Sequence, residues 1–310
     1  MINSFYSAFA AAQNERIGSI RHRTHCAVVS ENGPALGCTR VQLGAIGTKE
    51  REMTSSTNWQ AKQYVLFENE RTRPVRDLLA AIPATDVRVA VDIGCGPGNS
   101  TEALAARLPG AAVSGMDSSA DMIAAAIKRL PQFKFEVSDI ETWAAPGPYG
   151  LILANAVLQW VPNHEQLFPS LVKKLAPGGN LAVQMPDNLD EPAHRLLREI
   201  AADGPWANKL RGVERTMRYG ADWYYALLKP LCARVDVWRT VYHHPLAGGA
   251  DAVVEWFKGS ALRPFLAELD DSEQGVFLAR YRDAIARAYP AQTDGTVLLP
   301  FPRLFIVATR

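Results

Sequence analysis

The sequence predicts a doubly wound α/β fold: a mostly parallel sheet of seven strands with helices on both faces and an α-helical lid inserted in the C-terminal half. From about residue 73 to residue 186, short apolar segments alternate with amphipathic segments of helical length. The apolar segment "YGLILANA", residues 149–156, is typical of a central parallel strand buried on both faces. After residue 186, longer helical segments with aromatic and cationic residues favour a lid above the strand ends.

The element boundaries follow from hydrophobic spacing and from residues that start or stop helices. For example, Ser118 and Asp121 would form a capping box at the start of one helix, which Pro131 ends. We expect helices at 73–82, 100–108, 121–130, 165–176, 191–202, 251–269 and 272–290, with an irregular stretch from 203 to about 230. We expect strands at 87–94, 111–117, 133–139, 149–156, 180–186, 234–244 and 303–310, the last of them at an edge of the sheet.

The chain is expected to have two regions. Residues 1–58 show no sustained helical or strand period and little apolar clustering, so they are expected to lie outside the core. The preferred interpretation takes Met53 as the true initiator, with residues 1–52 either a gene-start artefact or a disordered tail. Residues 59–310 are expected to form the α/β domain, with its lid and substrate-binding elements mainly in 187–230 and 247–300.

Composition and charge exclude several classes of protein. The 310 residues are 48% hydrophobic and 21% charged, which is globular composition, and the net charge of +1 gives no general attraction to nucleic acid or to an anionic membrane. No apolar run reaches the roughly 20 residues that a membrane span needs. The cysteines show no C-x-x-C spacing, so we expect reduced thiols in the cytoplasm and no metal site; they are Cys26, Cys38, Cys95 and Cys232. The oligomeric state is not indicated.

The stretch "VDIGCGPGNST", residues 91–101, indicates the ligand. A dinucleotide fingerprint would place a third glycine where Asn99 stands, and a pyrophosphate would not favour the carboxylate of Asp92 at the strand end. A cation fits better, such as a ligand that carries an ammonium and a sulfonium beside an adenosine. An NAD dehydrogenase is therefore a weak alternative.

The acid followed by G-x-G-x-G resembles the first motif of class I S-adenosylmethionine-dependent methyltransferases, which implies that cofactor. The resemblance implies that Asp117 binds the ribose hydroxyls, that Asp139 binds the adenine amino group beside the backbone N–H of Ile140, and that Asn155 lies beneath the methionine portion. Each of the four residues also has a structural interpretation: Asp92 as a loop cap, Asp117 as a turn residue, Asp139 as a solvated acid and Asn155 as a loop amide. The expected cofactor-binding residues are Asp92, Gly94, Gly96, Gly98, Asp117, Ser118, Asp139, Ile140 and Asn155.

A narrower resemblance covers essentially residues 59–310. The segments "NAVLQWVP", "VQMPDN", "VDVWRTVYHHPL", "VEWFKGSALRPFL" and "FPRLFIVA" are similar to the trans-aconitate methyltransferase family. That resemblance implies esterification of one carboxylate of a small tricarboxylate. The alternatives are a methyltransferase for another small acceptor and a cofactor-binding regulator without catalysis.

Carboxylate methylation sets particular demands on the protein. The acceptor is already ionised at neutral pH, so no general base and no catalytic residue in the strict sense is expected. The enzyme must instead position the acceptor, exclude water and provide cations for the carboxylates that do not react. We expect Arg263, Arg303, His243 and Lys258 to bind the substrate, with His244 as the alternative to its neighbour, and Tyr64, Gln159 and Trp160 to close the pocket. An acceptor of high pKa would instead make the two histidines candidate bases.

Overall fold

The structure is a computed structural model that describes residues 68–83, 86–145, 147–213 and 219–310. The expectations for residues 1–58 and for Tyr64 lie outside the described residues. The strands are β1 (Val89–Ile93), β2 (Ala112–Asp117), β3 (Lys134–Val137), β4 (Tyr149–Asn155), β5 (Leu175–Pro186), β6 (Arg234–Leu246) and β7 (Val297–Thr309). The helices are α2 (Glu68–Ala81), α3 (Asn99–Arg107), α4 (Ala120–Arg129), η1 (Leu158–Trp160), α5 (His164–Lys173), α6 (Pro192–Ala202), α7 (Ala207–Leu210), α8 (Ala221–Leu228), α9 (Gly249–Lys258), α10 (Arg263–Leu266) and α11 (Asp271–Ala288).

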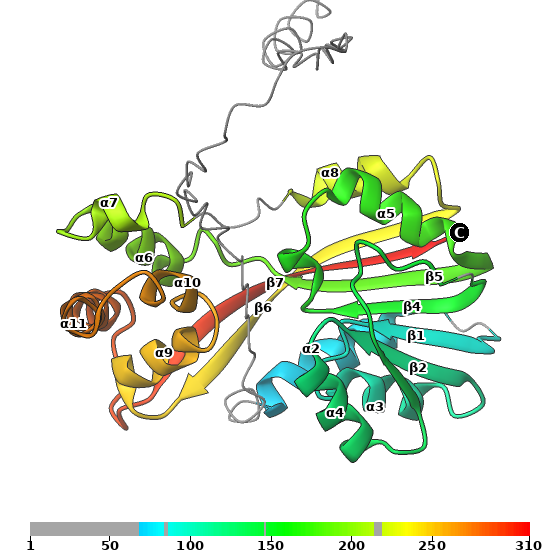
Figure 1. Cartoon of the computed structure of the whole chain (residues 1–310), viewed down its shortest axis with the longest axis horizontal. Coiled ribbons are helices and arrows are strands. Elements are labelled where there is room, and N and C mark those ends of the chain that lie inside the picture. Colours follow the sequence, from blue (N-terminus) through cyan, green and yellow to red (C-terminus); the bar gives the residue numbers. More distant parts are fainter. Residues whose placement is uncertain (1–67, 84–85, 146, 214–218) are drawn as a thin grey trace, which may run out of the picture. The chain divides into compact units, whose positions relative to one another are not determined.

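The strands form a seven-stranded sheet in the order β3-β2-β1-β4-β5-β7-β6 (Figure 1). β1 to β5 are parallel to one another, and β7 runs antiparallel to both β5 and β6. The chain builds outward from β1 in one direction and from β4 in the other, so the order of strands reverses between β1 and β4. The predicted doubly wound sheet is confirmed, and ligands of such sheets bind outside the carboxyl ends at this reversal point.

The expectation that the last strand forms an edge of the sheet is wrong. β7 lies between β5 and β6, and the edge strand is β6. The reason is visible in the segment "FPRLFIVA", residues 301–308, in which every residue is buried. An unbroken buried run is typical of a strand flanked on both sides and covered on both faces, whereas β6 shows more exposed positions.

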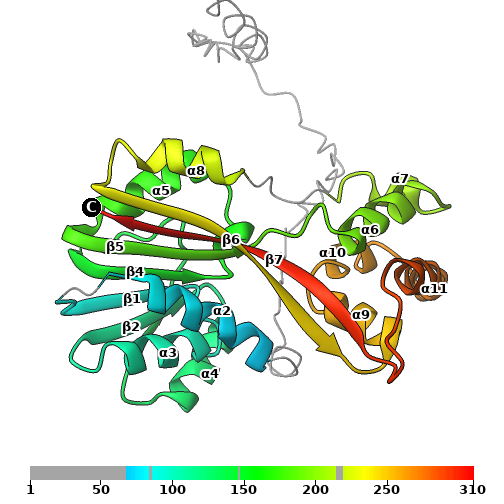
Figure 2. The same cartoon turned by 180° about the vertical axis from the view of Figure 1, so that it is seen from behind.

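Helices cover both faces of the sheet (Figures 1 and 2). On one face, which we call the α2 face, apolar residues of α2 and α3 pack on Leu153 of β4, Ala182 of β5 and Phe305 of β7. On the opposite face, α5 and α8 pack on Ile152, Val183 and other strand residues. The segment that forms α8 was expected to be irregular, and this expectation is wrong. The eight residues of the helix are too few to show a clear helical period in the sequence.

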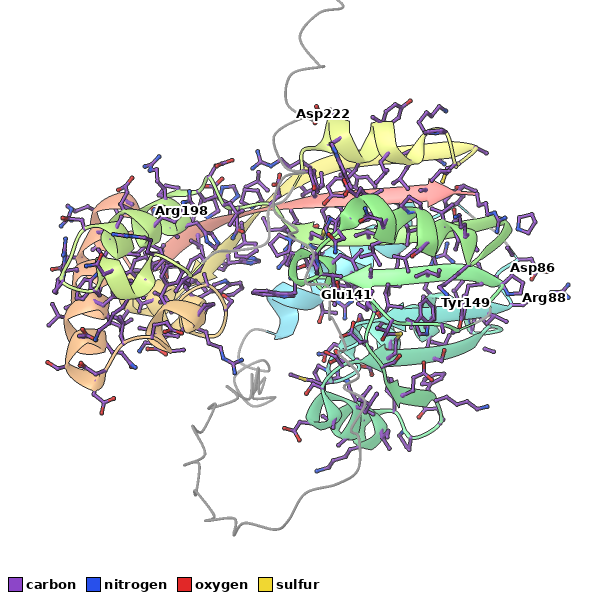
Figure 3. All side chains as sticks on the ribbon, turned by 45° about the horizontal axis from the view of Figure 1, so that its top comes forward. Asp86, Arg88, Glu141, Tyr149, Arg198 and Asp222 are labelled. Carbon is purple, nitrogen blue, oxygen red and sulfur yellow. The ribbon has the colours of Figure 1, made fainter. Side chains whose placement is uncertain are left out.

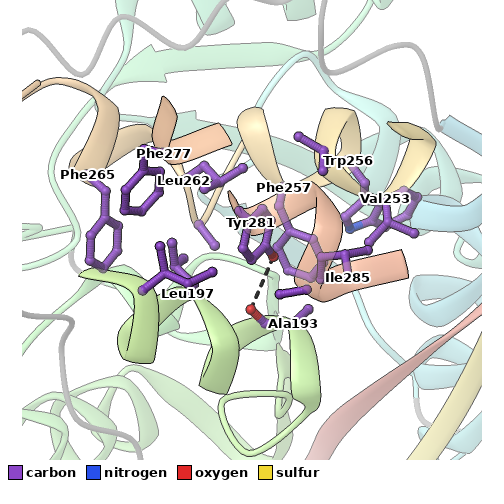
Figure 4. Close-up of a cluster of buried hydrophobic side chains, with 14 of the residues drawn as sticks. Ala193, Leu197, Val253, Trp256, Phe257, Leu262, Phe265, Phe277, Tyr281 and Ile285 are labelled. Atoms are coloured by element: carbon purple, nitrogen blue, oxygen red, sulfur yellow. Dashed lines mark hydrogen bonds between the residues drawn. The ribbon is translucent and has the colours of Figure 1, made fainter. Parts of the chain in front are cut away.

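A third apolar cluster joins the helices of the C-terminal half to the ends of two strands (Figure 4). Phe257 of α9, Tyr281 of α11 and Leu197 of α6 are buried together, and the Tyr281 hydroxyl donates to the Ala193 carbonyl over 3.1 Å. The strand residues in this cluster include Leu246 of β6 and Leu299 of β7. β6 and β7 are 13 residues long because one part of each belongs to the sheet and the other part to this helical cluster.

The N-cap of helix α4 lies one residue later than expected. Ser119, not Ser118, is the N-cap, and its side chain accepts a hydrogen bond from the backbone N–H of Met122. Ser118 is exposed and precedes the cap. The two adjacent serines gave the same sequence signal, and only the backbone of the turn decides which of them caps the helix.

The ion pairs lie mainly on the surface. Arg88 and Asp86, for example, pair over 3.3 Å at the amino end of β1, away from its carboxyl end (Figure 3). Exposed pairs of this kind contribute about 0–1 kcal/mol to stability, so the three apolar clusters stabilise the fold. Within the part of the chain that the structure describes, no helix is both long and apolar enough to cross a bilayer.

Candidate active site

The glycine loop after β1 is folded back onto the end of β2. Gly94, Gly96 and Gly98 have φ angles of 70°, 53° and 94°, in the left-handed region that glycine adopts without strain. The backbone N–H groups of Gly94 and Cys95 donate to the Met116 carbonyl over 2.7 and 2.9 Å. The loop is therefore fixed to β2 by main-chain hydrogen bonds.

Gly94 and Gly96 have different surroundings. A Cβ added at Gly94 would lie 2.2 Å from a methyl carbon of Val157, in the loop after β4. A Cβ added at Gly96 would meet no atom of the chain within 4 Å. Gly94 is thus required for packing between the two loops, whereas the open side of Gly96 is available to a ligand.

This difference gives a testable expectation. Gly94→Ala should lower the free energy of unfolding by several kcal/mol, because the methyl group overlaps Val157 in addition to straining the backbone. Gly96→Ala should cost only about 1 kcal/mol, from the positive φ, but should abolish cofactor binding. Urea unfolding and calorimetric titration with S-adenosylhomocysteine would measure the two effects. Equal stability losses in both variants would contradict this assignment.

Asp92 is completely buried at the carboxyl end of β1. Its Oδ2 accepts hydrogen bonds from the hydroxyls of Ser100 and Thr101, at 2.6 and 2.7 Å, in the first turn of α3. Its Oδ1 has no partner among the described residues. Burial raises the pKa of Asp92 to about 7, with the two hydrogen bonds opposing the shift and the charge of Asp117 adding to it.

The thiol of Cys95 is buried within the same loop. Burial and the neighbouring charges of Asp92 and Asp117 raise the pKa of the Cys95 thiol. A buried, protonated thiol is a packing group and a poor nucleophile.

The two acids expected to bind the nucleoside lie at the ends of β2 and β3. Asp117 accepts hydrogen bonds from the backbone N–H groups of Gly96 and Ser119, both over 2.9 Å. Asp139 is exposed and accepts from the N–H of Glu141 over 2.8 Å, with Ile140 between them. Both carboxylates thus shape the local turns while keeping further lone pairs for a ligand. Ribose and adenine binding at these residues stays a prediction.

The loop after β4 continues the site. Asn155 ends β4, as expected, and Ala156 follows with φ of 55°. The Gln159 side chain donates to the Ala156 carbonyl over 2.7 Å, and Trp160 is 41% exposed. Neither Asn155 Oδ1 nor Gln159 Oε1 has a hydrogen-bond partner in the described chain, although both atoms are buried. Together with Asp92 Oδ1, these oxygens are acceptors that lack donors.

His164 links the loop after β4 to helix α8 through two hydrogen bonds. Its Nε2 lies 2.8 Å from the Leu158 carbonyl in η1, and its Nδ1 lies 2.7 Å from the Tyr224 hydroxyl of α8. Since a carbonyl only accepts, the proton is on Nε2 and Nδ1 accepts from the tyrosine. Burial lowers the pKa of His164, which keeps the ring neutral in this arrangement.

Removing the Tyr224 hydroxyl tests this contact. Tyr224→Phe should lower the free energy of unfolding by about 1–2 kcal/mol, because the buried His164 Nδ1 then lacks its donor. Tyr225→Phe, at the adjacent and 45% exposed position, is the matched control and should leave stability within about 0.5 kcal/mol. Indistinguishable unfolding curves for the two variants would show that the hydrogen bond does not contribute.

A row of polar side chains crosses the sheet on the α2 face. Asp92 pairs in register with Leu153, Asn155 pairs with Gln184, and Arg303 pairs with Pro186. Directly paired residues of neighbouring strands point to the same face, and residues two apart on one strand do so as well. We call Asp92, Asn155, Gln184 and Arg303 the polar row; its members belong to β1, β4, β5 and β7.

Arg303 lies at the end of the polar row and is only 3% exposed. Its Nη1 donates to Gln184 Oε1 over 3.1 Å, and its guanidinium lies 4.8 Å from the centroid of the Phe301 ring. Nearby, the Tyr242 hydroxyl of β6 donates to Asp77 of α2 over 2.6 Å. Burial and this hydrogen bond raise the pKa of Tyr242, so its hydroxyl stays protonated.

The other predicted substrate-binding residues are placed differently. His243 is exposed, whereas His244 is buried and stacks on Trp256 with ring centroids 4.8 Å apart. Lys258 pairs with Glu255 on α9. Arg263 is half-buried at the first residue of α10. The structure thus brings Arg303 into the polar row; acceptor binding by His243, Lys258 and Arg263 stays a prediction.

Sequence reasoning missed several polar residues of the site. Gln184 is buried in the fifth strand, where a polar residue inside the apolar segment "NLAVQMP" is the signal that could have identified it. The Ser100 and Thr101 hydroxyls follow Asp92 by eight and nine residues and could have been expected at the start of the helix after the glycine loop. The Tyr242–Asp77 pair joins residues distant in sequence, and no local signal links them.

Comparison with known proteins defines the class. Residues 67–230 match the family model of a methyltransferase domain. The crystal structure of the YcgJ protein from Bacillus subtilis superposes with a TM-score of 0.50 at 10% identity, over 77% of this chain and 98% of that one, and shows the same fold. The class is therefore a methyltransferase built on a doubly wound α/β sheet.

Curated relatives define the family more narrowly. Trans-aconitate 2-methyltransferase of Variovorax paradoxus is 52% identical over 259 residues, which cover 82% of this chain and 98% of the relative. The enzyme of the same name from Rhizobium meliloti is 51% identical over 255 residues, with coverage of 82% and 99%. The chain belongs to the trans-aconitate 2-methyltransferase family. The resemblance inferred from the sequence is confirmed.

Proposed function

We propose that the chain transfers a methyl group from S-adenosylmethionine to a carboxylate of trans-aconitate, releasing a monomethyl ester and S-adenosylhomocysteine. Family membership supports this activity, since relatives at about 52% identity carry the name of that reaction. The structural observation that carries the proposal is the arrangement of the polar row, with acceptor atoms at one end and donors at the other.

The cofactor half of the proposal rests on the acceptor end. Buried oxygens of Asp92, Asn155 and Gln159 lack donors among the described residues, and an ammonium group carries the N–H donors that such oxygens need. Gly96 gives the glycine loop an open side. We propose that Asp92 and Asn155 bind the methionine portion, directly or through water, and that the ribose and adenine lie toward Asp117 with Ser118 beside it, and toward Asp139 and Ile140.

The substrate half rests on the donor end. A buried guanidinium is a favourable partner for a carboxylate, because its planar fork can donate two parallel hydrogen bonds. We propose that Arg303 binds a carboxylate that does not react, and that Arg263, Lys258 and His243 or His244 approach the remaining charge from the helical cluster. In this proposal the segments 187–230 and 247–300 include the lid over the acceptor, and Trp160 with Tyr64 closes the pocket.

The chemistry requires little from the protein beyond position and environment. When bound, S-adenosylmethionine supplies an electrophilic methyl group on a positively charged sulfur. The residues around it hold the acceptor oxygen in line and exclude water. Because the reacting charges neutralise each other as the bond forms, apolar surroundings favour the transition state. The acceptor is already ionised, so no side chain has to remove a proton.

Calorimetry tests the proposal in two steps. S-adenosylhomocysteine is titrated into the full chain, and trans-aconitate is then added to the same cell. Heat from both additions, together with a methyl ester when S-adenosylmethionine replaces the product, is the expected result. Binding of the nucleoside alone, with neither heat nor ester from trans-aconitate, would overturn the acceptor assignment and retain the cofactor assignment.

The proposal also includes a cytoplasmic location. It includes no nucleic-acid partner, in keeping with the near-neutral net charge of the chain.

A further inference from the structure

We propose that Gln184 is a substrate-binding residue, which grips the same non-reacting carboxylate as Arg303 and so helps to select a polycarboxylate acceptor. This inference rests on the proposed function and adds to it a residue that does not carry charge. Gln184 lies in β5, between Asn155 of β4 and Phe305 of β7 in the register of the sheet.

The orientation of the Gln184 amide follows from its partner. Arg303 Nη1 lies 3.1 Å from Gln184 Oε1. A guanidinium has no acceptor atom, so the amide oxygen is the atom that bonds Arg303, and the amide nitrogen on the same carbon is left for another acceptor. The side chain is 0% exposed, and its Nε2 has no hydrogen-bond partner among the residues that the structure describes.

A buried amide nitrogen without an acceptor requires an explanation, because buried polar groups are almost always hydrogen-bonded. The donor is at the carboxyl end of β5, one strand from the reversal point at which such sheets bind ligands. It stands beside a buried guanidinium. A carboxylate has two acceptor oxygens, so a single carboxylate is the ligand that matches this pair of donors.

The geometry also indicates which carboxylate is held. The reacting carboxylate must keep an oxygen lone pair free and in line with the methyl group, and hydrogen bonds from a guanidinium and an amide would reduce its nucleophilicity. Gln184 and Arg303 therefore hold a carboxylate that remains unmodified. Their contribution should be seen in acceptor affinity and in discrimination against acceptors that lack this second carboxylate.

Gln184→Glu is the sharpest test, because the new side chain has the same shape and still accepts from Arg303, but it replaces the amide donor with negative charge. We expect the KM for trans-aconitate to rise by about 30-fold or more at pH 8, while the Kd for S-adenosylhomocysteine changes less than about threefold. The introduced carboxylate is expected to stay ionised beside Arg303, so the KM should remain raised from pH 8 to pH 6. A structural role would instead weaken binding of S-adenosylhomocysteine together with that of trans-aconitate.

Two further variants keep the test decisive if Gln184→Glu folds poorly. Gln184→Met has similar length but no donor or acceptor, and it should raise the KM for trans-aconitate by about tenfold. Gln132→Glu makes the same charge change at an exposed position and should leave the KM unchanged. A KM within threefold of wild type in the folded Gln184 variants, or an equal loss of S-adenosylhomocysteine binding, would overturn the inference. Wild-type protein that forms no ester would instead overturn the proposed function itself.

Discussion

Replacing Arg303 with methionine should raise the KM for trans-aconitate by about 100-fold or more, with the affinity for S-adenosylhomocysteine nearly unchanged. Arg303 is buried in the polar row, so bulk water cannot replace the hydrogen bonds that its guanidinium donates. Loss of one partner of a buried, hydrogen-bonded charge pair costs about 2–5 kcal/mol. Initial rates at saturating methyl donor and varied trans-aconitate would measure the effect.

Two comparisons make this result interpretable. Arg303→Lys retains the charge but not the planar fork that bonds Gln184, and should recover only part of the affinity. Arg239→Met removes an exposed arginine of β6, paired with Asp187, and should leave the KM within about twofold. If acceptor and cofactor affinity fell together in Arg303→Met, the residue would support the fold and not the acceptor.

Asp92→Asn should weaken S-adenosylhomocysteine binding by about 10–100-fold and change how stability depends on pH. The pKa of Asp92 is raised from 3.8 to about 7, so the folded protein holds a proton that the unfolded chain releases. This group therefore reduces stability as the pH rises from about 4 to about 7. The asparagine variant lacks this loss, and its stability relative to wild type should increase by ~4 kcal/mol over that range.

Urea unfolding of the ligand-free protein between pH 4 and pH 8 would measure the relative change. Asp121→Asn, an exposed change on α4, is the control and should follow the wild-type dependence. The cofactor should also stabilise wild type more at pH 8 than at pH 6, since an ammonium binds the ionised carboxylate more strongly. A parallel pH dependence in wild type and Asp92→Asn would refute the role of this buried charge.

The parallel half of the sheet and the glycine loop could be predicted because their signals are local. Residues 91–101 combine a valine-rich strand, three glycines and a helix start in one short stretch, and the structure places Asp92, Gly94 and Gly96 in the corresponding positions. The position of β7 could not be predicted in this way. Strand pairing between residues far apart in sequence depends on tertiary packing, and only the unbroken burial of residues 301–308 indicates it.

The substrate half of the site was less predictable for the same reason. Arg303 could be selected because a charge inside "FPRLF" is unusual, but its neighbours come from separate strands and a helix. Gln184 of β5 accepts a hydrogen bond from it, and Tyr242 of β6, which lies within range of its charge, is bonded to Asp77 of α2. His243 and His244 show the complementary difficulty: alternation indicates that only one faces the core, but not which one.

The double membership of β6 and β7 limits how this enzyme can be redesigned or diversified. Both strands complete the sheet with one part and anchor the helical cluster with the other. A chimera that exchanged whole strands together with the helices would also remove Arg303 and the neighbours of β5. Exchange of the segment between Leu246 and Val297 alone would leave these pairings in place. New acceptor preferences are therefore most accessible through the helices between the two strands, with the strands themselves kept as a fixed frame.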